Sequence, residues 1–260
     1  MIYLKTDEEI ELMRISNLLV GKTLAEVAKA IKPGVSLLDL DKVAHEFILA
    51  NDAEPSFLGY NGFPNTLCIS VNDLVVHGIP NDYKLKEGDI VSVDCGVKKN
   101  GFHGDSCYTF CCGEVAPETL KFLKIVKESL MKGIEQAVEG KRVGDIGNAI
   151  QTYCEKAGYS VVREMVGHGI GRNLHEEPAV PNYGKASYGK VLKTGMVIAI
   201  EPMINFGAKE VYLADDHWGV YTADKSISAH YEHTVAIRRG EADILSSFEY
   251  IEQFLGSKSI

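Results

Sequence analysis

The run Ile90–Phe110, IVSVDCGVKKNGFHGDSCYTF, constrains the fold more than any other stretch of this chain. Asn100-Gly101 between alternating apolar residues is the strongest short sequence indication of a β-hairpin with a two-residue turn. With that turn, Asp94 lies on the same face as Asp105, its diagonal neighbour on the other strand. A one-residue slip would place the two carboxyl groups on opposite faces. Two acids on one face need a cation or a shared proton, so the rest of the chain must supply what neutralises them.

The opposite face of this predicted hairpin is apolar. With the two-residue turn, Val93 lies opposite Tyr108, and Val91 lies opposite Phe110. The sequence therefore predicts a strand pair with one face in the core and the other bearing the two acids.

Composition limits the class of protein. The chain has 260 residues, 45% of them hydrophobic, which is enough for a large core. Its formal net charge of -9 argues against nucleic acid or an anionic membrane as the main partner. The N-terminal residues lack the apolar segment of a signal peptide, and no stretch approaches the roughly 18 apolar residues of a membrane span. The six cysteines show no CxxC or disulfide-framework spacing, so reduced thiols in a cytoplasmic protein are expected.

Capping and periodicity predict helices and strands along the whole chain. Thr6 and Glu9 form a capping box that opens the first helix, which ends before Pro33-Gly34. A glycine- and aromatic-rich loop is predicted at 55–64. The further predicted helices cover 36–48, 117–138 and 143–156, and the predicted strands cover 66–71, 74–77, 160–166, 196–201, 216–222 and 230–238.

Two motifs of the first half recur in the second half. Residues 85–94 read LKEGDIVSVD and residues 192–201 read LKTGMVIAIE, with an acid closing each segment. Upstream of them, His77-Gly78-Ile79 recurs as His168-Gly169-Ile170. Repeats this far apart indicate two related halves of one domain rather than a solenoid, whose repeats are much shorter.

The two halves, about residues 1–112 and 113–260 of a single domain, would bring Asp94 and Glu201 towards one centre if they pack about a pseudo-twofold axis. Four carboxylates at one place cannot all stay ionised without cations. Two divalent ions would balance them, so charge favours a dinuclear site of mostly hard ligands, suited to Mn, Fe(II), Co or Zn. The candidate ligands are Asp94, Asp105, His168, Glu201 and Glu232.

The combined motifs resemble the methionine aminopeptidases of the type I, bacterial-like short form, within the M24 metallopeptidases, over essentially the whole chain. This resemblance implies an α+β pita-bread fold, a curved antiparallel β-sheet with two pseudo-twofold-related helix pairs. It also implies removal of the initiator methionine from nascent proteins with a small second residue. The motifs are VHGIP at 76–80, DCG at 94–96, GD at 104–105, GHGIG at 167–171, HEEP at 175–178, IEP at 200–202 and YEHT at 231–234.

The resemblance also assigns a role to each candidate ligand. Asp94 matches the bidentate ligand of one metal, and Asp105 and Glu232 match residues that bridge both metals. His168 and Glu201 complete the other metal, and Glu201 is the general base for a metal-bridging water. The implied cofactors are two divalent ions drawn from Co, Mn, Fe(II), Zn or Ni.

Substrate contacts are implied as well. His77 and His175 resemble the histidines that hydrogen-bond the substrate and the tetrahedral intermediate. An apolar methionine pocket with His77 at its rim is expected from Tyr60, Phe63, Cys68, Leu174 and Trp218, together with Phe57. Departures from the commoner family residues, which leave the tolerance for bulky second residues open, occur at Phe57, Phe63, Leu174 and His230.

Further expectations concern ions, partners and alternative functions. The resemblance implies a monovalent cation near Asn72, Leu74 and Ser228, and a monomer that meets nascent polypeptide N-termini, with contact at the ribosome left open. An Xaa-Pro aminopeptidase of the same fold and a non-catalytic pita-bread binding protein remain alternatives. A type II enzyme is disfavoured, because the 25 residues between His175 and Glu201 leave no room for its helical insertion.

Overall fold

The hairpin at the centre of the fold joins strands β4 (Ile90–Lys99) and β5 (Phe102–Cys111), each ten residues long. The computed structural model describes residues 1–256, and in it the last residue of β4 pairs with the first residue of β5. Asn100 and Gly101 form the turn with φ values of 53° and 79°. Positive φ at both central residues is what a type I′ turn requires. The predicted two-residue turn is confirmed.

The predicted register of the hairpin is confirmed as well. Asp94 lies opposite Cys107, and Asp105 lies opposite Gly96, so the two aspartates are diagonal neighbours on one face. The apolar pairs form as expected, with Val93 opposite Tyr108 and Val91 opposite Phe110, and all four side chains are buried.

Helices follow the predicted starts, although one prediction was too long. Capping boxes at Thr6 and Ser36 begin the first two helices. The third helix was predicted to reach about Val138 but ends at Ile134, because Val138 forms an extended bridge with Arg238. The last helix lacked a sequence prediction. The helices are α1 (Asp7–Ala30), α2 (Leu37–Ala50), α3 (Pro117–Ile134), α4 (Val143–Lys156) and α5 (Glu249–Leu255), with a 3-10 turn at Tyr60–Gly62.

The remaining strands are short and antiparallel to their neighbours. They form sheets in the orders β1-β4-β2 with β5 on β4, β13-β10-β6, β11-β12-β3 and β15-β14-β9-β7-β8. The strands are β1 (Glu54–Pro55), β2 (Leu67–Val71), β3 (Leu74–Val76), β6 (Ser160–Val161), β7 (Gly167–Gly169), β8 (Glu176–Val180), β9 (Val197–Ile200), β10 (Met203–Asn205), β11 (Val211–Leu213), β12 (Val220–Thr222), β13 (Ser228–His230), β14 (His233–Ala236) and β15 (Asp243–Ile244).

Three predicted strands are shorter than the sequence suggested. The predicted strand 160–166 is paired only as β6, and 216–222 only as β12. The predicted strand 230–238 breaks at Tyr231-Glu232 and resumes as β14. At this break the backbone N–H of Glu232 donates to the carbonyl of Cys107, 3.0 Å away in β5. The break therefore joins the hairpin of the first half to the strands of the second.

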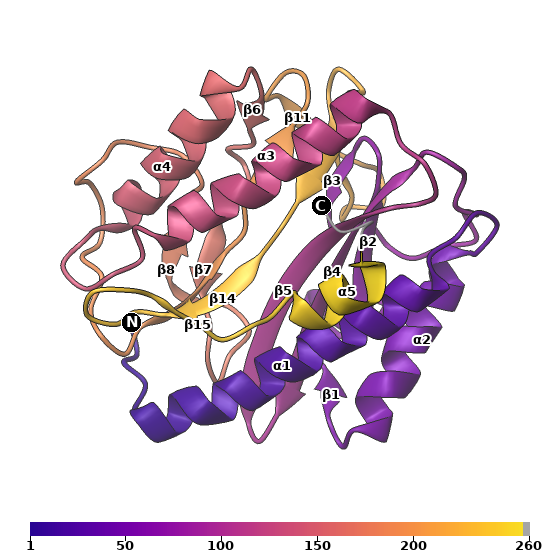
Figure 1. The fold of residues 1–260 in the computed structure, drawn as a ribbon. Coiled ribbons are helices and arrows are strands. Elements are labelled where there is room, and N and C mark those ends of the chain that lie inside the picture. The colour runs from indigo at the N-terminus through magenta and orange to yellow at the C-terminus, as the bar shows by residue number, and fades with distance from the viewer. Residues whose placement is uncertain (257–260) are drawn as a thin grey trace.

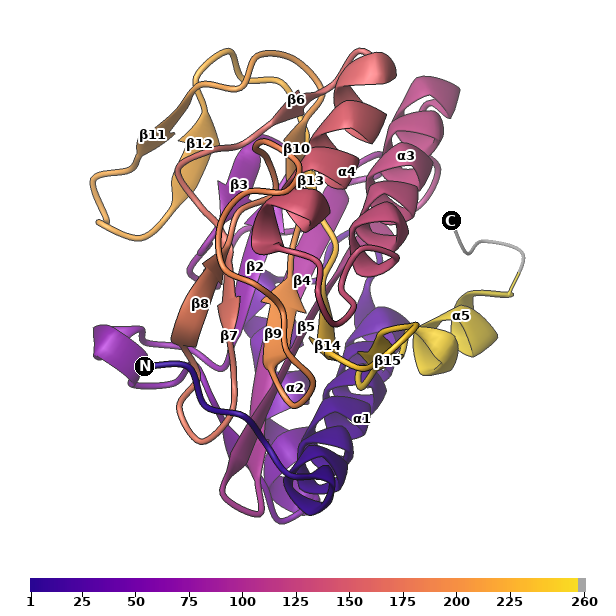
Figure 2. The same cartoon turned by 90° about the vertical axis from the view of Figure 1, so that its left-hand side faces the viewer.

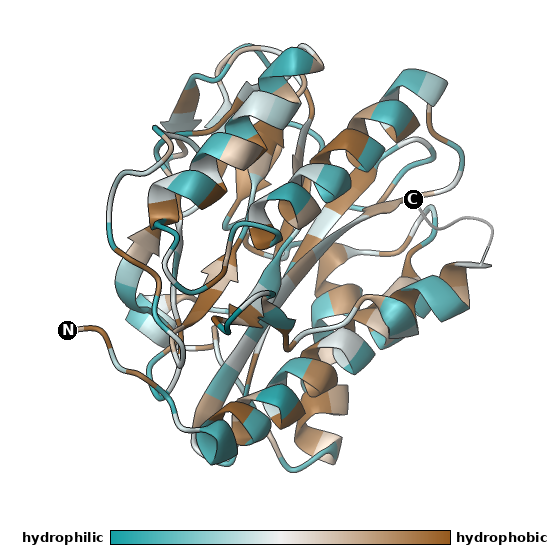
Figure 3. Cartoon of the chain, turned by 60° about the vertical axis from the view of Figure 1, so that its left-hand side comes forward, coloured by the Kyte–Doolittle hydropathy of each residue, from teal (hydrophilic) through white to brown (hydrophobic). Residues whose placement is uncertain are grey.

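The helices cover one side of the strands. In Figure 2, α1, α3 and α4 lie to one side of the β-strands, while the β11–β12 ribbon projects on the other. Figure 1 shows α1 crossing in front of the long β4–β5 hairpin, with α3 lying above it. Hydrophobic and hydrophilic stretches alternate along α3 and α4 in Figure 3, as expected of helices with one buried face. None of the helices within residues 1–256 combines the length and apolar character needed to cross a membrane.

Candidate metal centre and active site

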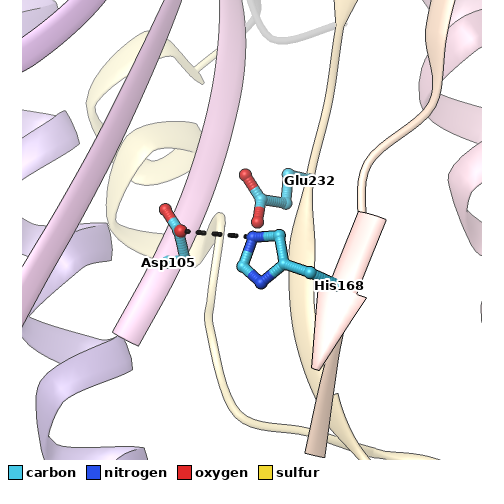
Figure 4. Close-up of side chains that lie close together, drawn as sticks. All are labelled: Asp105, His168 and Glu232. Carbon is cyan, nitrogen blue, oxygen red and sulfur yellow. Dashed lines mark ion pairs between the residues drawn. The ribbon is translucent and has the colours of Figure 1, made fainter. Parts of the chain in front are cut away.

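Three of the predicted ligands form a compact cluster. Asp105 on β5, His168 on β7 and Glu232 between β13 and β14 each offer a ligand atom within 4.8 Å of the others (Figure 4). His168 Nδ1 lies 2.9 Å from the carbonyl of Gly169, and because a carbonyl only accepts, this nitrogen carries the proton. His168 Nε2 is then free to present its lone pair towards the carboxylates, which is the arrangement common in metal-ligating histidines.

The other two predicted ligands adjoin this cluster. Glu201, directly after β9, places Oε1 3.6 Å from His168 Nε2, and Asp105 Oδ2 lies 3.9 Å from the same nitrogen. Asp94 shares a sheet face with Asp105, and its proximity contributes to the raised pKa of Asp105, after burial. The structure thus brings all five predicted ligands together, from strands of both halves of the chain.

Burial makes ionisation of these four carboxyl groups unfavourable without cations. Burial raises the pKa of Asp94 to about 7. It raises the pKa values of Asp105, Glu201 and Glu232 well above their usual range, and the neighbouring carboxylates raise them further. Buried oxygens without a hydrogen-bond partner occur on Asp94, Asp105 and Glu232. Such oxygens are what a bound cation would satisfy, so these residues fit a divalent metal centre.

The same electrostatics predict how stability depends on pH in protein stripped of metal by a chelator. The pKa of Asp94 in the fold, about 7, is above its unfolded value of about 4, so the folded state retains a proton that the unfolded chain releases. That contribution to stability is lost as pH rises through the folded pKa. Burial lowers the pKa values of His168 and His230 to about 3, so both rings stay neutral above pH 7 and do not oppose the trend. Half of the Asp94 carboxyls still carry the proton at pH 7 and almost none at pH 9, so Asp94 alone should lower the melting temperature by about 1 to 2 °C over this range, and the raised pKa values of Asp105, Glu201 and Glu232 add to the fall.

Calorimetry at these two pH values, with chelator and then with excess Mn²⁺, measures the effect. Added cation should raise the melting temperature more at the higher pH, where the carboxylates are already deprotonated. Asp94→Asn is the matched variant, and it should weaken the pH dependence in chelator, while Asp105, Glu201 and Glu232 continue to contribute. A melting temperature that is independent of pH in chelator would contradict this account of the site.

Polar side chains that the sequence analysis did not single out hold the ligand strands in place. Asn17, buried in α1, accepts a hydrogen bond from the backbone N–H of Asp105 at 3.2 Å. Ser16 and Asn17 interrupt the apolar face of that helix, which is the local feature that could have indicated them. The remaining supports are Thr234 to the Asp105 carbonyl at 2.8 Å, Ser106 to the Glu232 carbonyl at 2.7 Å and Asn182 to the Glu201 carbonyl at 2.9 Å.

Both predicted substrate histidines lie beside the metal centre. His175 Nδ1 lies 2.8 Å from the hydroxyl of Tyr60, and its ring packs edge-on to His168 with 4.2 Å between centroids. Burial lowers the pKa of His175. Burial, and then the proximity of His175, lowers the pKa of His77, which follows β3 with a positive φ of 59°. Both rings are therefore neutral at pH 7 and can donate one hydrogen bond each.

One departure from the family pattern lies at the centre itself. His230 Nε2 is buried without a hydrogen-bond partner, 3.9 Å from Glu201 Oε2. This distance is too long for a hydrogen bond. The backbone of His230 is fixed by Thr109, whose Oγ1 donates a hydrogen bond to the His230 carbonyl at 2.7 Å. His230 is therefore part of the immediate surroundings of Glu201.

The predicted pocket residues belong to one apolar cluster next to the metal centre. Phe63 and Trp218 form an edge-on ring pair, 5.1 Å between centroids, and Cys68 pairs directly opposite Asp94 across β2 and β4. Gly96 is required here, because a Cβ at this position would lie 2.6 Å from the ring of Phe57. The predicted members found in the cluster are Phe57, Tyr60, Phe63, Cys68, Leu174 and Trp218.

The residues predicted to hold a monovalent cation are close together but already hydrogen-bonded. The backbone N–H of Ser228 donates to the Asn72 carbonyl at 2.8 Å, and Ser228 Oγ donates to the Ile204 carbonyl at 3.1 Å. Asn72 donates to Asp89 at 2.8 Å through its side chain. Leu74 opens β3 two residues later. The cation site stays a prediction.

Acidic and imidazole side chains converging from facing strands, with buried carboxylate oxygens left unpartnered, define a metal-dependent hydrolase centre. The chain belongs to metallopeptidase family M24, whose sequence pattern matches residues 11–239. It is 51% identical to a methionine aminopeptidase of Clostridium perfringens over 95% of this chain and 99% of that protein. By this likeness it groups with the methionine aminopeptidases, which are hydrolytic metallo-exopeptidases.

Solved structures support the same grouping. The methionine aminopeptidase of Rickettsia prowazekii matches with a TM-score of 0.94 and 42% identity, covering 95% of this chain and 100% of that chain. A prolidase from Pyrococcus furiosus matches with a TM-score of 0.78 and 24% identity, covering 94% of this chain but 65% of that chain. At that identity the prolidase shows the fold alone. Together the two likenesses confirm the pita-bread fold expected from the sequence.

Proposed function

We propose that this chain removes the N-terminal methionine from proteins and peptides whose second residue is small, using two divalent cations. The observation that carries the proposal is the adjacency of the ligand cluster and the apolar pocket. His175 joins them, because its ring contacts His168 on one side and the Tyr60 hydroxyl on the other. A peptide with its first side chain among the pocket residues would then have its first carbonyl at the metal centre.

The five acid and imidazole side chains of Asp94, Asp105, His168, Glu201 and Glu232 would hold the cations. Divalent cations bound there supply Lewis-acid activation of a water molecule and of the scissile carbonyl. The ligand set suits Mn, Fe(II) or Co, and Zn or Ni are further candidates.

The proton moves through this chain's own residues. Glu201 accepts the proton of the attacking water and delivers it to the departing amine, as a general base and then a general acid. Without cations, burial raises the pKa of this carboxyl well above its usual range, and bound cations would keep it ionised and able to accept the proton. If the Tyr60 hydroxyl donates to His175 Nδ1, then His175 carries its proton on Nε2 and can donate it to the carbonyl oxygen as charge develops. His77 would supply a second donor at the pocket rim.

The setting of the reaction follows from the substrate. Nascent polypeptide N-termini are the proposed partners, in the cytoplasm, with a monomer as the working form. A single chain contains every residue assigned above, so the chemistry needs no second copy. The net charge of -9 makes direct binding of nucleic acid unfavourable.

A peptide panel tests this function. The purified protein, reconstituted in turn with Mn²⁺, Co²⁺, Fe²⁺, Zn²⁺ or Ni²⁺, should release methionine from Met-Ala-Ser and leave Ala-Pro-type peptides intact. Replacing the second residue by leucine should lower kcat/KM by at least about 100-fold if the second-residue site is small. Preferential cleavage before proline would instead identify an Xaa-Pro aminopeptidase. Full metal occupancy without cleavage of any peptide would identify a non-catalytic binding protein.

A further inference from the structure

A buried ion pair ties the segment before α1 to the loop that carries His175. Lys5 Nζ lies 2.6 Å from Glu176 Oε2, and the two side chains are 5% and 4% exposed. The partners are 171 residues apart in sequence. In Figures 1 and 2 the segment before α1 runs from that helix towards the β7–β8 strands, the location of this pair.

Additional contacts fix both residues of the ion pair. The backbone N–H of Lys5 donates to the carbonyl of Gly195 at 2.7 Å, so the backbone of the lysine is held as well as its ammonium group. Glu176 Oε1 accepts a hydrogen bond from the backbone N–H of Asn173 at 3.2 Å. The lysine stem packs so closely on Gly171 that a Cβ at this glycine would lie 2.6 Å from Lys5 Cε. The ion pair therefore contacts the loop near its start at Gly171, at its middle at Asn173 and at its end at Glu176.

This loop connects β7 with β8 and bears His175, a proposed catalytic residue. His175 is the residue before Glu176; the residue is exposed to solvent on one side, and its ring contacts His168 and the Tyr60 hydroxyl. A ring on a loop with contacts on one side relies on the backbone beside it to keep its direction. The position of the ring, 4.2 Å from His168, therefore depends on how firmly the backbone beside it is held.

We propose that Lys5 and Glu176 are positioning residues of the active site, and that their ion pair holds the loop so that His175 faces the metal centre. This inference rests on the proposed role of His175. Neither Lys5 nor Glu176 is placed in contact with the substrate. A buried ion pair alone is weak evidence for stability, since desolvation of both charges offsets their attraction. What distinguishes this pair is the loop it closes.

Four variants separate positioning from stability. Lys5→Met leaves a buried carboxylate unpaired, so it should lower both the melting temperature and turnover. Glu176→Gln removes the charge of the partner and, should Lys5→Met fail to fold, tests the same ion pair. Lys5→Met/Glu176→Gln removes both charges, so it should recover the melting temperature but not turnover. Lys5→Arg keeps the pairing and should retain most of the turnover.

The expected kinetic result is a loss in kcat of about 10- to 100-fold for Lys5→Met, with KM within about twofold, because misplacement of a catalytic group by about 1 Å costs this much. Metal content, measured on the purified protein, should stay unchanged. The matched control is Lys29→Met, which breaks an exposed pair of the same length, 2.6 Å from Lys29 Nζ to Glu26 Oε1. That variant should change neither kcat nor the melting temperature appreciably.

Combination with His175→Ala distinguishes failure of this inference from failure of the proposed function. If the pair acts through His175, Lys5→Met should cause no further loss of kcat in the His175→Ala background. Recovery of kcat in the double Lys5/Glu176 variant would make the pair structural only, and an unchanged kcat in Lys5→Met would overturn positioning. If His175→Ala itself leaves kcat unchanged, the role proposed for His175 fails and the inference falls with it.

Discussion

Replacing Glu201 by glutamine should lower kcat by at least about 10⁴-fold. The substitution keeps the length and shape of the side chain but removes the charge that a cation would require and the base proposed to take the proton of water. General base catalysis alone is worth up to about 10⁴-fold, and loss of a ligand oxygen adds to it. Glu201 Oε1 lies 3.6 Å from His168 Nε2, so the changed side chain is next to the ligand cluster.

Two measurements on the same preparation separate the roles of Glu201. Release of methionine from Met-Ala-Ser gives kcat, and metal analysis gives the number of ions retained across a titration. Loss of turnover with full metal occupancy would assign Glu201 the role of general base. Loss of metal occupancy would assign it the role of metal ligand. Glu177→Gln, an exposed acid beside Pro178, is the matched control and should leave both quantities unchanged. Wild-type turnover in Glu201→Gln would exclude both roles.

The hairpin could be predicted in register because its determinants are local. Asn100-Gly101 sets the turn, and one apolar face then fixes which residues lie opposite one another. The candidate ligands could be singled out because an acid at the end of an apolar strand, such as Asp94 or Glu201, has no solvated face to explain it. Repetition of the two segments supplied the link between the halves, and the five side chains do converge.

Other features depend on contacts between distant parts of the chain. The break at Tyr231-Glu232 arises because Cys107, in the other half, accepts the backbone hydrogen bond of Glu232. No pattern within residues 230–238 contains that partner. The pair of Lys5 with Glu176 spans 171 residues for the same reason, and each residue alone has the sequence context of a surface charge. Hydrogen bonds and ion pairs between residues far apart in the chain cannot be predicted from local sequence patterns.

Position 230 shows a different limit. The sequence indicated that His230 departs from the family pattern, and the expected consequence was a change in pocket shape. The structure adds that His230 Nε2 is buried near Glu201 Oε2, which only three-dimensional contacts can show. Identity at a position can be compared along a sequence, but which neighbour a side chain faces follows from the fold.

Replacing His175 by alanine should lower kcat by about 10²- to 10³-fold while leaving the metal content near that of the wild type. In the proposed mechanism the ring donates a hydrogen bond to the carbonyl oxygen as negative charge develops, and loss of one such donor costs about this much. His175 is not among the residues of the ligand cluster, and its Nδ1 is engaged by Tyr60. Metal binding should therefore survive the substitution.

The substitution can be tested by kinetics and metal analysis together. Because the donor acts on the transition state more than on the bound substrate, kcat should fall much more than KM rises. Tyr60→Phe is the companion variant: it removes the hydroxyl at 2.8 Å that orients the ring, so a smaller loss in kcat is expected. Loss of metal from His175→Ala would make this histidine a ligand and would redraw the division between ligands and substrate-binding residues. An unchanged kcat would leave stabilisation of the oxyanion to the cations and to His77.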